Sequence, residues 1–109
     1  MSNGLIIVKA KITIKTKEEG GRTTGFHSGY RPNHFFEPPD DLKNISAYPG
    51  DIQFTDQRLV EPGENKIVTV RFLNTPGIKK YMTVGRKWFI NEGPTTIGFG
   101  EILEVQNFE

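Results

Sequence analysis

Polar and apolar side chains alternate at every second position in residues 9–17, and this period of two most constrains the fold of the chain. A period of two places alternate side chains on opposite faces of an extended strand, whereas an amphipathic helix needs a period of 3.6. The same alternation recurs in residues 68–73, 88–91 and 96–105. No window places apolar residues at helical spacing over three turns. The sequence therefore predicts strands and no long helix.

Turn-forming residues divide the chain at short intervals, since Gly and Pro favour turns over the interior of a strand. Gly98 and Gly100 fall on one face of the predicted strand 96–105, which indicates a bend or a close backbone approach, as at a barrel corner. Short strands joined by tight turns are typical of small sandwiches and barrels. We therefore expect an all-β fold with six or seven strands. The expected turns lie at residues 18–21, 37–40, 48–51, 61–64, 75–77 and 91–94.

Length and composition exclude several classes of protein. A chain of 109 residues suits one domain, which we expect to span residues 1–109. The absence of Cys excludes disulfide bonds, zinc–thiolate sites and a cysteine nucleophile. The longest apolar run, Leu5–Val8, is too short for a membrane span or a signal-peptide core. We therefore expect a complete, soluble, cytoplasmic protein that does not contact membranes.

Motifs for enzyme chemistry are weak. No Gly-Lys dipeptide is present, so the phosphate-binding loop that nucleotide binding needs is missing. Ser28 stands one position too late for a nucleophile elbow, and the adjacent His27 points to the opposite face of an extended segment. A hydrolase-like site built from His27, His34 or Asp40 is the least favoured alternative. We expect no enzyme activity, no cofactor, no nucleotide and no metal site.

Four lysines, Lys9, Lys11, Lys15 and Lys17, lie on the polar face of the first predicted strand. One interpretation is a ladder of contacts to a phosphate backbone. The other is a solvated face on which lysines protect an edge strand from aggregation. No aromatic residue lies among these lysines, and the formal net charge of the chain is only +1. We therefore favour the solvated face.

Four longer motifs point to a known family. Residues 19–22 read Glu-Gly-Gly-Arg, and residues 29–32 read Gly-Tyr-Arg-Pro. Residues 61–64 read Glu-Pro-Gly-Glu, and residues 88–100 read Trp-Phe-Ile-Asn-Glu-Gly-Pro-Thr-Thr-Ile-Gly-Phe-Gly. In order and spacing these motifs resemble the C-terminal domain of bacterial elongation factor Tu over about residues 10–105. The resemblance implies a six- or seven-stranded, closed, antiparallel β-barrel that stands alone, without the GTPase domain.

The resemblance also implies candidate RNA contacts. In elongation factor Tu this domain contacts the T-stem backbone of aminoacyl-tRNA, the GTPase domain and the nucleotide exchange factor. Carried over by position, the RNA side falls on Arg22, Asn33, Glu92 and Gly93. The chain departs from the family at Asn91, where the family has an arginine, and a lost arginine weakens contact with a polyanion.

A second departure favours protein binding. Phe89 stands where the family has a small alanine, on the face that meets the GTPase domain. An exposed aromatic residue there either blocks that docking or forms a new apolar interface. We therefore favour a non-catalytic protein-interaction barrel that uses Tyr30, Arg31 and Phe89, with a protein partner or self-association. The alternative is translation-related binding of tRNA or rRNA.

Overall fold

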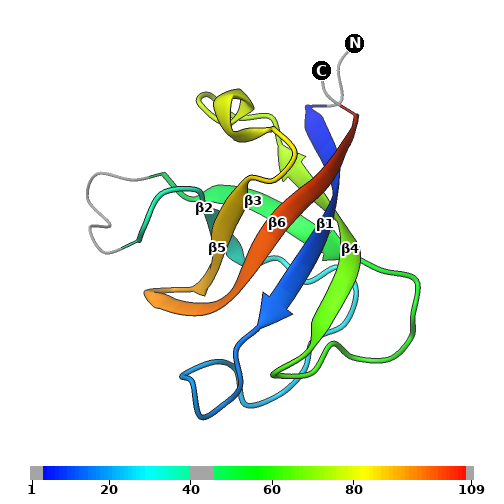
Figure 1. Ribbon diagram of the computed structural model, residues 1–109, viewed down its shortest axis with the longest axis vertical. Coiled ribbons are helices and arrows are strands. Elements are labelled where there is room, and N and C mark those ends of the chain that lie inside the picture. The colour runs from blue at the N-terminus through cyan, green and yellow to red at the C-terminus, as the bar shows by residue number, and fades with distance from the viewer. Residues whose placement is uncertain (1–3, 40–45, 108–109) are drawn as a thin grey trace.

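The computed structural model describes residues 4–39 and 46–107, and it shows a closed antiparallel barrel of six strands (Figure 1). Around the barrel the order is β1-β4-β3-β2-β5-β6, and β6 closes on β1. The predicted all-β, closed antiparallel barrel is therefore confirmed. The part of the chain that the structure describes contains no helix with the length and apolar character of a membrane span. The elements are β1 (Leu5–Ile14), β2 (Asn33–Phe35), β3 (Tyr48–Gln53), β4 (Asn65–Leu73), the 3-10 turn η1 (Lys79–Tyr81), β5 (Lys87–Glu92) and β6 (Thr95–Asn107).

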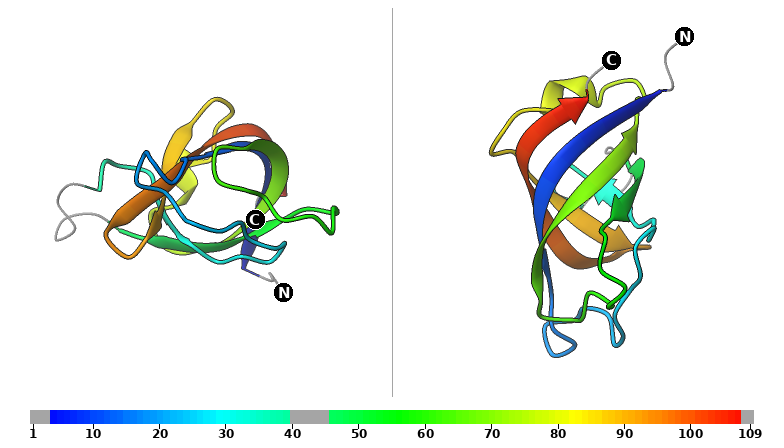
Figure 2. Two further views of the ribbon diagram at one scale, coloured as in Figure 1. Left: turned by 90° about the horizontal axis from the view of Figure 1, so that it is seen from below. Right: turned by 90° about the vertical axis from the view of Figure 1, so that its right-hand side faces the viewer.

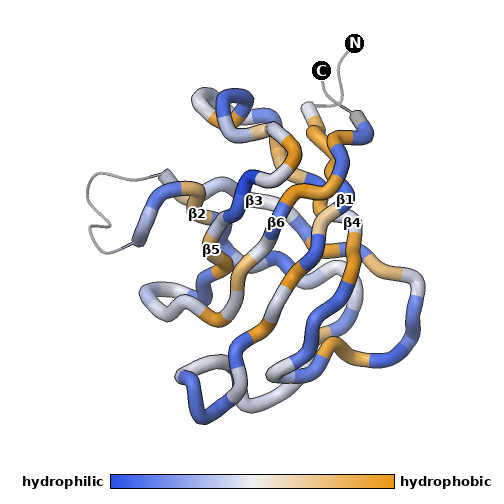
Figure 3. Tube along the Cα trace, viewed as in Figure 1, coloured by the Kyte–Doolittle hydropathy of each residue, from blue (hydrophilic) through white to orange (hydrophobic). Residues whose placement is uncertain are grey.

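Strand β1 lies between β4 and β6 and shows how alternation builds the barrel wall (Figure 2). Its outward side chains include Lys9, Lys11 and Thr13, which are exposed. Hydrophilic and hydrophobic residues alternate along β1 and β4 (Figure 3). Since alternate side chains of a strand face opposite sides, one set fills the interior and the other contacts water. The inward residues of β1, each at most 2% exposed, are Ile6, Val8, Ala10, Ile12 and Ile14.

The interior of the barrel is filled by aromatic rings around Trp88. Its ring centre lies 5.6 Å from that of Phe72 and 5.5 Å from that of Phe36. Gly100 of β6 provides the space, because a Cβ on Gly100 would lie 2.4 Å from Cζ2 of Trp88. A Cβ on Gly98 would lie 2.7 Å from the carbonyl oxygen of Thr13. The close backbone approach expected at these two glycines is confirmed.

Three local expectations are wrong. The turn expected at residues 48–51 lies inside β3, where Pro49 is exposed and pairs with Asn33 of the three-residue strand β2. Proline is tolerated there because it stands near the start of its strand. Strand β1 is paired on both sides, so its lysines do not protect an edge. The strand also ends at Ile14, which leaves Lys15 and Lys17 outside it.

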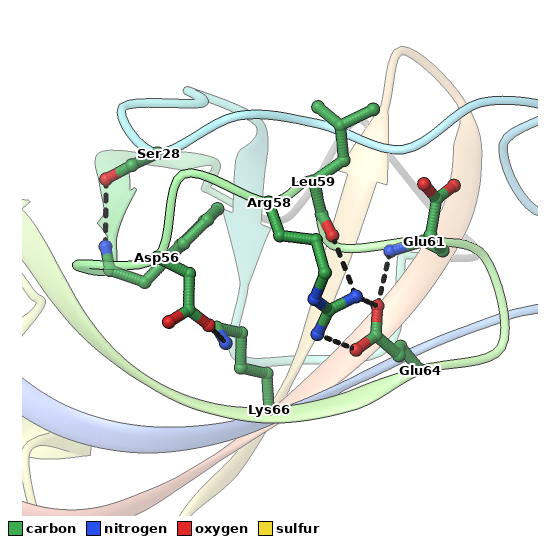
Figure 4. Close-up of polar contacts among 8 residues, drawn as sticks. Ser28, Asp56, Arg58, Leu59, Glu61, Glu64 and Lys66 are labelled. Atoms are coloured by element: carbon green, nitrogen blue, oxygen red, sulfur yellow. Dashed lines mark hydrogen bonds and ion pairs between the residues drawn. The ribbon is translucent and has the colours of Figure 1, made fainter.

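Ion pairs hold the connection between β3 and β4 (Figure 4). Arg58 donates to both carboxylate oxygens of Glu64, at 3.1 and 2.6 Å, and Lys66 pairs with Asp56. Glu64 also accepts the backbone N–H of Glu61 at 2.7 Å. The Arg58 guanidinium and this N–H lower the pKa of Glu64 to about 2. The expected turn at residues 61–64 is confirmed by the bond from the Glu64 N–H to the Glu61 carbonyl oxygen, 3.1 Å.

Candidate functional site

Three of the predicted site residues meet where the connection between β1 and β2 passes the β5–β6 turn. The carboxylate of Glu92, at the end of β5, accepts hydrogen bonds from the Arg22 guanidinium and from the Tyr30 hydroxyl. The guanidinium carbon of Arg22 lies 5.0 Å from the centre of the Tyr30 ring, within range of a cation–π interaction. The side chains of Arg22 and Glu92 are 21% and 38% exposed. We call these three residues the Arg22 cluster.

The remaining donors of Arg22 are used within its own segment. Its Nε donates to the carbonyl oxygen of Thr24 at 3.0 Å, and its Nη2 donates to that of Gly25 at 3.2 Å. Burial, reinforced by Glu92, raises the pKa of Tyr30 above its ordinary value, so its hydroxyl remains a donor at neutral pH. A phosphate would therefore have to displace Glu92 in order to reach Arg22.

The other two predicted RNA contacts lie beside this cluster. Gly93 occupies the first position of the two-residue turn between β5 and β6, with φ of 56°. A left-handed φ at this position suits glycine in a tight hairpin. Asn33 is exposed on β2 and pairs with Asn91, the residue before Glu92. The structure thus brings Arg22, Glu92 and Gly93 together and places Asn33 on the neighbouring strand.

Arg31 lies in a separate depression of about 340 Å³, which Asn33 also lines. Arg71 and Asp51 also line this depression, and Arg71 donates to both carboxylate oxygens of Asp51, at 2.9 and 2.6 Å. This pairing with Arg71 lowers the pKa of Asp51. The Arg31 side chain itself is exposed.

Phe89 lies on the outer side of the barrel, packed edge-on against Phe99 of β6 with ring centres 5.9 Å apart. Phe99 is 41% exposed. Together they line a groove of about 750 Å³, which we call the aromatic groove. Phe89 and Arg31 therefore line different hollows of the surface. Other residues that line the aromatic groove include Lys11, Thr13, Pro38, Arg86, Lys87 and Glu101.

The elongation factor Tu C-terminal domain family matches this chain over residues 5–106, which include five complete strands and nearly all of β6. The chain belongs to this family. The resemblance seen in the four sequence motifs is therefore confirmed, and the fold is a translation-factor-like barrel module. Within the elongation factor Tu C-terminal domain fold, three of the predicted site residues meet in the Arg22 cluster. Arg31 and Asn33 line the smaller depression, and Phe89 is the one predicted site residue that lines the aromatic groove.

Phe99 is a residue of the aromatic groove that the sequence interpretation missed. It stands between Gly98 and Gly100, which are buried against Thr13 and Trp88. Because strand side chains alternate, two inward-facing glycines place the residue between them on the outside. The sequence Gly-Phe-Gly therefore contained the signal for an exposed aromatic residue.

Of the hydrolase-like alternative, the described part of this elongation factor Tu C-terminal domain family barrel contains only the two histidines, one in the interior and one at the surface. His34 is 0% exposed, and both ring nitrogens have partners in the interior. Ser28 Oγ accepts the N–H of Phe54 at 2.8 Å, while His27 is exposed. Asp40 lies outside the described residues. Among the described residues no group of three or more His, Asp or Glu side chains could hold a metal ion.

Proposed function

We propose that this barrel is a non-catalytic protein-interaction module whose contact surface is the aromatic groove. The observation that carries the proposal is the pairing of Phe89 and Phe99 on the outside of the barrel. Aromatic side chains are enriched at protein interfaces, where they supply large contact areas at low entropic cost. A closed barrel needs neither ring for its own interior, since Trp88, Phe72 and Phe36 already fill it.

The edge of the groove also suits a protein partner. Lys11 and Lys87 both lie beside Glu101, their partner in the β1–β6 and β5–β6 ladders. Mixed charge around an apolar centre provides specificity in protein recognition, whereas a nucleic acid requires a surface of predominantly positive charge. The groove therefore favours a folded protein or peptide over RNA.

RNA binding is the second candidate function, favoured by the gathering of Arg22, Glu92 and Gly93. The Arg22 cluster weakens this candidate, because its guanidinium already binds a carboxylate, a hydroxyl and two backbone carbonyls. A titration of labelled tRNA at several salt concentrations tests it. Micromolar binding with a salt dependence that Arg22→Ala reduces would establish RNA binding and overturn the protein proposal.

Site-specific photo-crosslinking in living cells tests the protein proposal. A photoreactive phenylalanine analogue replaces Phe99, and a matched control carries it at the exposed Thr55, outside the groove. We expect adducts of defined mass from position 99 and none from position 55. The crosslinked protein is then purified and titrated, and Phe89→Ala should weaken its binding roughly tenfold or more. Equal crosslinking at both positions, or unchanged affinity, would contradict the proposal.

A further inference from the structure

The outer face of β1 and β6 carries two rows of opposite charge. Lys9 and Lys11 stand on β1, and Glu101 and Glu104 stand on β6. In the ladder Lys11 pairs with Glu101, and Lys9 pairs with Glu104. A positive row therefore runs beside a negative row along neighbouring strands, and we call this surface the charged face.

These four side chains form no ion pair with one another in the described residues. No carboxylate oxygen lies within 4.0 Å of the ammonium nitrogens of Lys9 or Lys11 in residues 4–39 and 46–107. The described residues do form ion pairs elsewhere, at Arg22, Arg58, Lys66, Arg71 and Arg86. The charges of the charged face are therefore available to another molecule.

The two rows end at the aromatic groove. Phe99 precedes Glu101 by two positions on the same side of β6, and it pairs with Thr13 of β1 and with Phe89 of β5. On the side of β1 that faces away from β6, Ile67 of β4 pairs with Lys11 and is 57% exposed. The charged face thus joins a mixed-charge surface to exposed apolar side chains, as a stable protein interface requires.

We infer that a second copy of this chain binds the charged face and the aromatic groove, about a twofold axis that runs along the strands between β1 and β6. This inference rests on the proposed function and names its partner. The axis places β1 of each copy over β6 of the other. Lys11 then faces Glu101 of the second copy, Lys9 faces Glu104 of the second copy, and Phe99 contacts Thr13 of the second copy.

The charge pattern favours this occupant over a polyanion. A twofold interface uses the same patch twice, so the patch must be complementary to itself, and adjacent rows of opposite sign meet this requirement. A phosphate backbone that followed Lys9 and Lys11 would also lie beside Glu101 and Glu104. The formal net charge of +1 adds little repulsion between two copies.

The test measures the mass of the purified chain by sedimentation equilibrium over a range of concentrations. Lys11→Glu and Glu101→Lys should each raise the dissociation constant of the dimer roughly tenfold or more. Each variant places two like charges opposite each other in both halves of the interface. An equimolar mixture of the two variants should restore it. In the mixed dimer the glutamate of one variant faces the lysine of the other, and the two native residues face each other.

Lys80→Glu on η1 is the matched control, since it makes the same charge change outside both surfaces. A wild-type chain that remains monomeric up to about 1 mM, where a specific dimer would form, overturns the inference, as does a mixture that remains monomeric. Adducts at position 99 with another protein, together with a monomeric chain, would overturn the inference and leave the proposed function standing. A monomer without any adduct at position 99 would overturn both.

Discussion

Trp88 donates its indole N–H to Nδ1 of His34 at 2.9 Å, in the interior of the barrel. On the other side of the imidazole, Nε2 lies 3.0 Å from the carbonyl oxygen of Gly50. Because an indole only donates and a carbonyl only accepts, these contacts fix the neutral tautomer with its proton on Nε2. A second proton, on Nδ1, would point at the indole N–H. Burial lowers the pKa of His34 to about 4.

Acid should therefore unfold the barrel through His34 before its carboxylates titrate. The pKa of this histidine is about 6.5 in the unfolded chain and about 4 in the folded chain, so the unfolded state binds the proton first. The stability is fully present above pH 6.5 and is lost as the pH falls towards 4, by about 3 kcal/mol in total. Urea unfolding at a series of pH values between 7 and 4 measures this loss.

Trp88→Phe provides the control for that pH dependence. Without the indole N–H, a proton on Nδ1 of His34 no longer meets an opposing donor, so the loss of stability between pH 6.5 and 4 should shrink. The variant is also less stable at pH 7, because it leaves Nδ1 without a partner. Asp51 and Glu64, whose pKa values are lowered, contribute their own loss only below about pH 4.5. An unchanged slope in Trp88→Phe would show that burial alone, and not the opposed indole N–H, lowers the pKa of His34.

The barrel was predictable because its evidence is local. A period of two and frequent turn residues occur within short windows, and the inward-facing Gly98 and Gly100 lie in one strand. The expected turn at residues 48–51 failed for a related reason. Pro49 and Gly50 have turn propensity, yet pairing with β2 and β4 holds them in a strand. Tertiary pairing thus prevailed over local propensity.

The candidate site was less predictable, because its contacts join residues far apart in the chain. Arg22 and Glu92 were each identified as candidates, but the two stand 70 positions apart and nothing in the sequence pairs them. Their ion pair gives Arg22 a structural role, because it connects two segments, while contact between Arg22 and a phosphate stays a prediction. His34 likewise changes from a candidate catalytic residue to an interior hydrogen-bonding group.

Arg22→Ala should destabilise the barrel by about 1–2 kcal/mol, because it leaves Glu92 and two backbone carbonyls without their half-buried donor. Arg31→Ala is the matched control, since this arginine is exposed and belongs to the same connection between β1 and β2. Its effect should remain within about 0.5 kcal/mol. Chemical unfolding at pH 7 compares the two variants. If Arg22→Ala lowered the free energy of unfolding by no more than Arg31→Ala does, the Arg22 cluster would not contribute to stability.

Gly100→Ala should destabilise the barrel by about 1–3 kcal/mol through overpacking. The new Cβ would lie 2.4 Å from Trp88, whose ring packs against those of Phe36 and Phe72. Thr95→Ala is the control on the same strand, since Thr95 is exposed beside the β5–β6 turn. Thermal unfolding of both variants measures the difference. A wild-type melting temperature for Gly100→Ala would show that the interior is more loosely packed than described.

Glu64→Ala should loosen the connection between β3 and β4 and leave the barrel folded. The carboxylate of Glu64 accepts hydrogen bonds from both terminal nitrogens of Arg58 and from the N–H of Glu61, so one substitution removes all three. Because the Arg58 side chain is 58% exposed, the global loss should be below about 1 kcal/mol. Hydrogen exchange should nevertheless become several-fold faster in residues 55–61, where opening is local. Glu61→Ala is the matched control, because Glu61 contributes its backbone N–H and not its side chain to this contact. Faster exchange in both variants, or in neither, would show that the Glu64 carboxylate does not hold the connection in place.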